Sequence, residues 1–157
     1  QRGQRAGTEN AAGAAAIANS ATDSYKNIDE HTEYVRQIKK ALWEGISSNI
    51  PEVYINGDTV ENSNPYVLNV AFKDIRSEVL LHALEEKDIY VSAGSACDSK
   101  KKALSHVLLA MNIEPDLIEG SIRFSFSRFN TVLEAEKCVE ELTKIVPMLR
   151  RVQRMRR

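Results

Sequence analysis

Hydrophobic and polar positions in the first part of the chain repeat with the period of an α-helix. The alanine-rich stretch 9–26 predicts a helix from about Ala11 to Tyr25, because alanine is the best helix former. After a polar break at 27–29, apolar residues recur at spacings of three, four and four positions, which places them on one face of a second helix. These residues are Val35, Ile38, Leu42 and Ile46. Pro51 ends this second helix.

Beyond Pro51 the period changes, and strands alternate with helices. Asn56-Gly57 is a turn signal that closes a first short strand. Tyr66–Phe72 alternates in the manner of a half-buried strand, and Arg76–Lys87 has the pattern of an amphipathic helix. The predicted elements are strands at 52–57 and 66–72, a helix at 76–87, a strand at 89–93, a short helix at about 105–111 and a strand at 121–129.

The last strand and the last helix carry the clearest local signals. Along 121–129, Ile122, Phe124 and Phe126 alternate with Arg123, Ser125 and Ser127, which predicts a strand with two different faces. Thr131 and Glu134 have the spacing of a capping box, and the helix they open carries an apolar stripe. This stripe contains Cys138, Leu142, Ile145 and Leu149. The order of elements predicts an α+β fold, with a small, mostly antiparallel sheet and helices packed on one face.

Composition and charge indicate one ordinary soluble domain without a charged partner. The 157 residues are 43% hydrophobic with a net charge of -1, so no global field recruits nucleic acid or an anionic membrane. No apolar run approaches the roughly 20 residues of a membrane span, and the first ten residues lack the apolar stretch of a signal peptide. The arginine-rich tail 150–157 complements the dipole of the last helix and needs no partner. We expect neither a nucleic-acid nor a membrane partner.

The cysteines and histidines indicate a reducing compartment and no metal site. Cys97 and Cys138 are too few for a disulfide framework, so a cytoplasmic location is the default expectation. Neither these cysteines nor the three histidines have metal-ligand spacing. The chain begins at Gln1 and enters a polar, glycine-containing motif at once, which suggests a piece of a longer protein.

Cys97 is the candidate nucleophile. It follows the small residues Gly94, Ser95 and Ala96 and precedes lysines at 100–102, and nearby cations lower the pKa of a thiol. The alternative is a small buried cysteine at a strand end, because free cysteine is among the most buried residue types. Cys138 differs, since its place on the apolar stripe of the last helix predicts a core residue.

Two further positions are candidate anion-binding sites. Arg123 lies on a strand among serines, and its planar fork suits a carboxylate; the alternative is an exposed arginine or a structural ion pair. Gly7-Thr8 precedes a helix and offers N–H groups and a hydroxyl to a phosphate; the alternative is simple helix capping by Thr8 or Asn10.

Three motifs occur together in this order: "RGQRAGTEN", "VSAGSACDS" and "SIRFSFSRFNT". In combination they resemble the C-terminal part of cysteine desulfurases of the nitrogen-fixation and iron–sulfur-cluster type, which are fold-type I pyridoxal-phosphate enzymes of the class V aminotransferase group. The resemblance covers nearly the whole chain. It implies the small C-terminal domain of such an enzyme over 1–157, with 1–10 as the end of a glycine-containing cofactor-phosphate motif.

The resemblance also implies roles for individual residues. Cys97 would take sulfur from L-cysteine and become a persulfide, leaving L-alanine. Arg123 would hold the α-carboxylate of the substrate, and Thr8 would reach the cofactor phosphate of the other subunit in a homodimer. Arg5 occupies the family's arginine position without an assigned role. The implied partners are L-cysteine and a sulfur-acceptor or iron–sulfur scaffold protein.

Two departures from the family pattern qualify these roles. Asp98 and the lysines at 100–102 stand where the family has small polar residues, a leucine, an acid and a proline, which leaves the acceptor open. No His-Lys pair occurs, although the family's Schiff-base lysine follows a histidine. We therefore expect the large pyridoxal-phosphate domain to be absent, and the isolated chain to be inactive without cofactor. The alternatives are another class V enzyme, such as a selenocysteine lyase or an aminotransferase, and a non-enzymatic α+β binding module.

Overall fold

The computed structural model describes residues 9–94 and 104–155 and divides the chain into two compact units between His31 and Thr32. The first unit contains helix α1, Ala11–Lys26, which confirms the helix predicted from Ala11. Asn10 caps this helix, because its side-chain oxygen accepts a hydrogen bond from the Gly13 N–H at 3.0 Å. None of the residues of α1 is buried.

The second unit is built on a four-stranded antiparallel sheet in the order β1-β2-β4-β3. The strands are β1 Val53–Ile55, β2 Val67–Phe72, β3 Ser92–Ala93 and β4 Ser121–Ser125. Each strand is shorter than its sequence pattern predicted, and β3 keeps only the last two residues of 89–93. β2 and β4 form the middle of the sheet, so residues on these two strands have neighbours on both sides.

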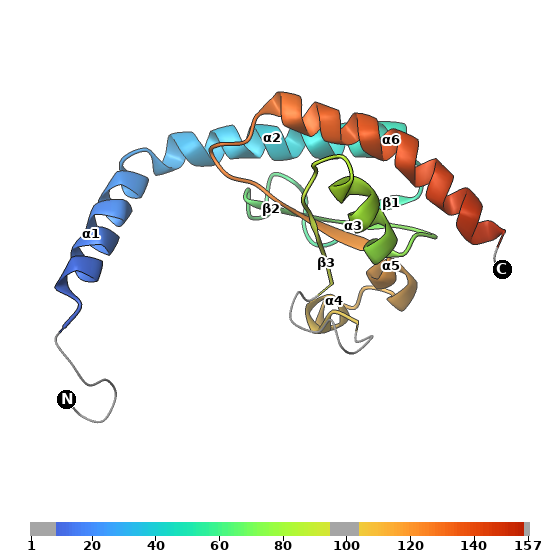
Figure 1. Ribbon diagram of the computed structural model, residues 1–157, viewed down its shortest axis with the longest axis horizontal. Coiled ribbons are helices and arrows are strands. Elements are labelled where there is room, and N and C mark those ends of the chain that lie inside the picture. The colour runs from blue at the N-terminus through green and yellow to red at the C-terminus, as the bar shows by residue number, and fades with distance from the viewer. Residues whose placement is uncertain (1–8, 95–103, 156–157) are drawn as a thin grey trace. The chain divides into compact units, whose positions relative to one another are not determined.

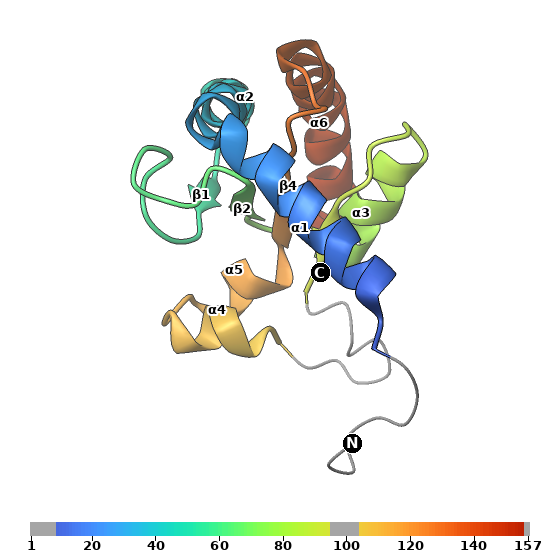
Figure 2. The same cartoon turned by 90° about the vertical axis from the view of Figure 1, so that its left-hand side faces the viewer.

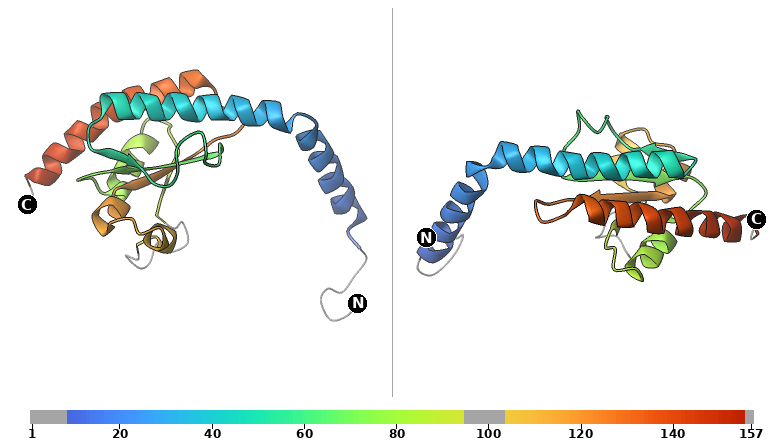
Figure 3. Two further views of the ribbon diagram at one scale, coloured as in Figure 1. Left: turned by 180° about the vertical axis from the view of Figure 1, so that it is seen from behind. Right: turned by 90° about the horizontal axis from the view of Figure 1, so that it is seen from above.

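Three helices cover one face of the sheet, which confirms the predicted α+β layer. They are α2 Ile28–Asn49, α3 Ser77–Glu85 and α6 Val132–Arg154. Figure 1 shows α2 and α6 along one side of the sheet, Figure 2 shows α3 next to α6, and the view from above in Figure 3 shows α2 and α6 running side by side. The predicted capping box of α6 is present: the Glu134 N–H donates to Thr131 Oγ1, and the Thr131 N–H donates to Glu134 Oε2.

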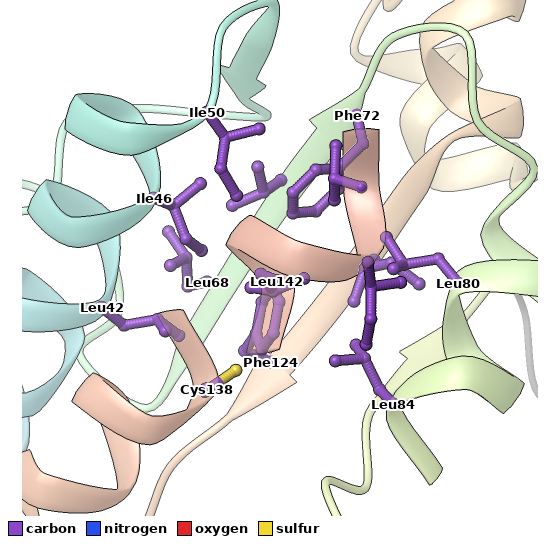
Figure 4. Close-up of a cluster of buried hydrophobic side chains, with 14 of the residues drawn as sticks. Leu42, Ile46, Ile50, Leu68, Phe72, Leu80, Leu84, Phe124, Cys138 and Leu142 are labelled. Atoms are coloured by element: carbon purple, nitrogen blue, oxygen red, sulfur yellow. The ribbon is translucent and has the colours of Figure 1, made fainter. Parts of the chain in front are cut away.

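The hydrophobic core lies between these helices and the sheet (Figure 4). The predicted stripe of α2 is buried throughout, and so is the α6 stripe at Cys138, Leu142 and Ile145. Their partners include Leu68 and Phe72 of β2, Leu80 and Leu84 of α3, and Phe124 of β4. Because Ile122 and Phe124 point into this core, Arg123 between them points to the opposite face.

Two short helices, α4 His106–Ala110 and α5 Pro115–Glu119, precede β4 and lie on the side of the sheet away from α2 and α6 (Figure 1). The sequence pattern predicted α4 but missed α5. Gly120 follows α5 at a position that has no room for a side chain. A Cβ atom there would lie 2.9 Å from the Ile75 carbonyl oxygen, so only glycine fits between α5 and the end of β2.

Two buried cations fix the connections between these elements. Lys39 of α2 donates through Nζ to Ser63 Oγ and, at 2.9 Å, to the Asn64 carbonyl. Arg150 of α6 donates to the carbonyls of Pro51, Glu52 and Lys73 at 2.8, 3.0 and 3.0 Å. Burial lowers the pKa of both groups, with Arg36 as a second cause for Lys39. These side chains therefore serve the fold, and neither is available to a ligand.

Candidate functional site

The candidate site is the sheet face opposite α2, α3 and α6, which α5 covers at Ser121 and which leaves Arg123 exposed. Arg123 lies at its centre, exposed on β4, and pairs in register with Asn69 of β2 on one side and Ser92 of β3 on the other. One contact orients the guanidinium, a 3.4 Å hydrogen bond from Arg123 Nη2 to Ser92 Oγ. The remaining guanidinium donors make no hydrogen bond to any described residue, which leaves a planar fork available for a carboxylate.

A group of neutral polar side chains continues this face toward β1. Asn56 Nδ2 donates to Asn69 Oδ1 and to Ser121 Oγ, each at 2.8 Å, and Ser121 Oγ donates to the Leu117 carbonyl at 2.7 Å. Ser121 is buried, and Asn56 and Asn69 are half-buried. Sequence reasoning missed this group. The available signal was an asparagine within the apolar strand 66–72, where that residue type is disfavoured.

The end of β3 leads from this face into the segment that contains Cys97. Ser92 and Ala93 pair with Arg123 and Ile122, and Gly94 then adopts a φ of 60°, a left-handed conformation that glycine takes without strain. Cys97 itself lies outside the described residues, as do Thr8 and Arg5. The structure therefore places Arg123 of the predicted site residues and gives no position for Cys97 or Thr8.

Cys138 is a core residue, as its place on the α6 stripe predicted. Its side chain lies among Leu42, Phe124 and Leu142 (Figure 4) and is 6% exposed. Burial raises the pKa of its thiol to about 12, because the apolar surroundings disfavour the thiolate. Cys138 is thus unsuited to nucleophilic chemistry near neutral pH.

A groove of about 430 Å³ lies on the helix side of the sheet and is distinct from the face that carries Arg123. It runs between α2 and α6, and its walls include Ile38, Tyr90, Phe126 and Cys138. The residues at 9–94 and 104–155 contain no cluster of three or more metal-ligating side chains. Within the same ranges, no helix combines the length and the apolarity needed to cross a membrane.

The strand residues around Arg123 do not by themselves fit a pyridoxal-phosphate site. The strand residues that share a face with Arg123 in the registered pairs include no lysine to form an imine. Lys39 is buried and engaged with Ser63 and Asn64, so it cannot serve instead. Neither the paired strand positions nor Lys39 can therefore supply the lysine that holds such a cofactor.

Comparison with known proteins gives one consistent family. The aminotransferase class-V family matches residues 1–138. A cysteine desulfurase of Gluconacetobacter diazotrophicus is 38% identical over 150 residues, with 96% of this chain and 37% of that protein covered. The cysteine desulfurase NifS of Azotobacter vinelandii is 36% identical over 152 residues, with coverages of 97% and 38%. The chain thus spans a little over a third of the length of these relatives.

Solved structures agree with this assignment. A NifS-like protein superposes with a TM-score of 0.77 at 27% identity, over 94% of this chain and 36% of that one. A NifS-like protein from Rickettsia africae gives 0.73 at 25% identity, over 90% and 36%. The Escherichia coli cysteine desulfurase CsdA, at 18% identity and a TM-score of 0.71 over 92% and 33%, shows the same fold. The match over 1–138 and these shared folds together establish that the chain belongs to the class V aminotransferase family.

Proposed function

We propose that this chain is the small C-terminal domain of a cysteine desulfurase. The full-length enzyme converts L-cysteine to L-alanine and leaves a persulfide on Cys97. The similarity to named cysteine desulfurases along 96% of the chain supports this activity. The observation that carries it is Arg123, an exposed fork on the sheet face opposite α2 and α6, paired with the strand that leads into the Cys97 segment.

Arg123 binds the α-carboxylate of L-cysteine in this account. Guanidinium and carboxylate pair through two parallel hydrogen bonds, which fixes the orientation of the substrate as well as its position. Ser92 holds the guanidinium from the β3 side through the bond to Nη2. The exposed position of Arg123 leaves its outer donors open to a ligand.

Cys97 is close enough along the chain to act on a substrate held at Arg123. Five peptide steps join Ser92, which pairs with Arg123, to Cys97, and that length of chain spans at most roughly 18 Å. The thiolate attacks the sulfur of L-cysteine, the new S–S bond forms, and the Cβ–S bond breaks. Its electron pair stays with the carbon skeleton, where bound pyridoxal phosphate would delocalise it, and Cβ takes up a proton to give alanine.

The rest of the enzyme supplies the parts that this chain lacks. Pyridoxal phosphate and its lysine belong to a large domain outside the chain, and Thr8 contacts the cofactor phosphate of the partner in a homodimer. The persulfide sulfur then passes to an acceptor or iron–sulfur scaffold protein, and we place the enzyme in the cytoplasm. Similarity to cysteine desulfurases named NifS and IscS supports the sulfur-transfer part of this proposal.

Alanine release by the full-length protein with pyridoxal phosphate tests this function. Cys97→Ser abolishes alanine formation from L-cysteine, while Cys138→Ala, which removes a core thiol, retains it. Arg123→Lys keeps the charge but loses the fork, so the KM for L-cysteine rises by roughly tenfold or more. A Cys97→Ser enzyme that releases alanine at the wild-type rate would exclude a persulfide mechanism and favour another class V activity.

A further inference from the structure

A row of four polar side chains crosses the whole sheet on the face of Arg123. The β1–β2 register pairs Ile55 with Val70, and the next pair along it is Asn56 with Asn69, joined by a 2.9 Å bond from the Asn56 N–H to the Asn69 carbonyl. Asn69 pairs with Arg123, and Arg123 pairs with Ser92. Paired residues of antiparallel strands project to the same side. The polar row is therefore Asn56, Asn69, Arg123 and Ser92, one residue from each strand or its extension.

Asn69, in the middle of this row, is not needed for the conformation of the backbone. Asparagine is depleted in strands, and Asn69 lies on β2, which has neighbours on both sides. Asparagine is often retained where a left-handed φ is needed, but Asn69 is not among the positive-φ residues of the described chain. Its flanking residues Leu68 and Val70 are fully buried on the other face and do the packing. The Asn69 side chain is therefore explained by what its amide group contacts.

Hydrogen-bond directions along the row follow from the Leu117 carbonyl. Because a carbonyl only accepts, Ser121 Oγ must donate its proton to Leu117 and can only accept from Asn56. Asn56 must then present its NH₂ group to Ser121, and the same group meets Asn69. Asn69 consequently turns its oxygen toward Asn56 and its own NH₂ group away from it.

Both central members of the row therefore offer unused donors side by side. Asn69 Nδ2 donates to no described residue, and Arg123 uses a single guanidinium nitrogen, on the Ser92 side. The Cβ atoms of directly paired strand residues lie about 4.5–5.5 Å apart, which suits two donors that meet one planar anion. Neither side chain presents an acceptor to that space, because the Asn69 oxygen is occupied by Asn56.

We propose that Asn69 is a second carboxylate-binding residue of the substrate site, and that Asn56 is its positioning residue. Asn69 Nδ2 donates a hydrogen bond to the same carboxylate that the Arg123 fork holds. Asn56, itself fixed by Ser121 and Leu117, keeps the Asn69 amide in the donating orientation. This inference rests on the proposed function, since it concerns the α-carboxylate of L-cysteine.

Steady-state kinetics of the full-length enzyme with L-cysteine test this inference. Asn69→Ala removes the donor, and Asn56 retains its bond to Ser121, so the fold is preserved. Loss of a hydrogen bond to a charged group raises KM roughly tenfold or more, with kcat within about threefold, because the carboxylate does not react. Asn69→Asp replaces the donor with a carboxylate that repels the substrate carboxylate, so it raises KM more than Asn69→Ala does. Asn56→Ala gives a smaller increase in KM.

The matched control is Asn62, an exposed residue of the β1–β2 connection, as Asn62→Ala and Asn62→Asp. Both controls keep the wild-type KM. Equal KM values for Asn69→Ala and Asn62→Ala would overturn the inference. A smaller increase in KM for Asn69→Asp than for Asn69→Ala would also overturn it. If Asn69→Asp does not fold, the comparison of Asn69→Ala with Asn62→Ala decides the question. Circular dichroism melts confirm that both alanine variants are folded. A wild-type enzyme that releases no alanine would refute the proposed function instead.

Discussion

Thiol labelling separates the two cysteines by a margin that follows from the burial of Cys138. Its thiol has a pKa of about 12, so at about pH 7.5 roughly 3 in 10⁵ molecules carry the thiolate. A thiol with the ordinary pKa of about 8.5 is about 9% ionised at this pH. Ionisation alone thus favours such a thiol over Cys138 by about 3,000-fold.

Intrinsic nucleophilicity reduces this margin without removing it. Thiolate reactivity rises with pKa with a Brønsted slope of about 0.4–0.5, so a difference of about 3.5 pKa units returns a factor of about 40 to Cys138. The net preference for a thiol of ordinary pKa is then about 80-fold. Exclusion of the reagent adds to it, because the Cys138 side chain is only 6% exposed.

The assay is a time course with Ellman's reagent on the native chain. The Cys138→Ser variant retains the fast phase, the Cys97→Ser variant lacks it, and both label alike in urea. Equal, slow labelling of both native variants at the rate of global unfolding would make Cys97 a buried structural residue. That result would remove the main local support for a sulfur-transfer role.

Three further predictions concern the fold. Arg150→Met takes the donor from the Pro51 and Lys73 carbonyls and lowers the free energy of unfolding by roughly 2–5 kcal/mol in urea titrations, whereas an unchanged midpoint would refute the role of Arg150. Cys138 stays protonated in the folded chain to about pH 12, but its thiol ionises near 9.0 when unfolded, so unfolding becomes easier as pH rises between these values. The free energy of unfolding falls by up to about 1.4 kcal/mol per pH unit from this cause, and Cys138→Ala loses that contribution. An equal pH dependence in both proteins would contradict the burial of the thiol. Gly120→Ala brings a Cβ against backbone carbonyls and lowers the thermal midpoint, whereas the same midpoint as the parent would contradict the close approach.

Elements with several turns or a clear alternation were predictable from the sequence. The α2 stripe from Val35 to Ile46 is buried as predicted, since four apolar residues at helical spacing leave few alternatives. The alternation of apolar and polar residues around Arg123 predicts the sheet face on which it lies. α5 was missed although Pro115 at its start is a helix-start signal; like α4, it has only five residues and buries one of them, too little for a periodic signal.

The contacts that depend on register or long sequence separation were not predictable. Asn56 and Ser121 are 65 residues apart, and only the pairing of β1, β2 and β4 brings them together. Arg150 binds carbonyls 77 to 99 residues away, and a charged residue on a helix is ordinarily expected in solvent. Arg123 was thus identifiable as a candidate site residue from the sequence. Asn69 is a candidate only because the pairing of β2 with β4 places it beside Arg123.

Mass spectrometry of the full-length enzyme after a single turnover with L-cysteine determines whether Cys97 receives the sulfur atom. Proteolysis under alkylating conditions places any persulfide on an individual peptide. We predict one additional sulfur atom on the peptide that contains Cys97, none on the peptide that contains Cys138, and one alanine released for each persulfide formed. Alanine release without added sulfur on Cys97, or added sulfur that persists in the Cys97→Ser variant, would contradict this prediction.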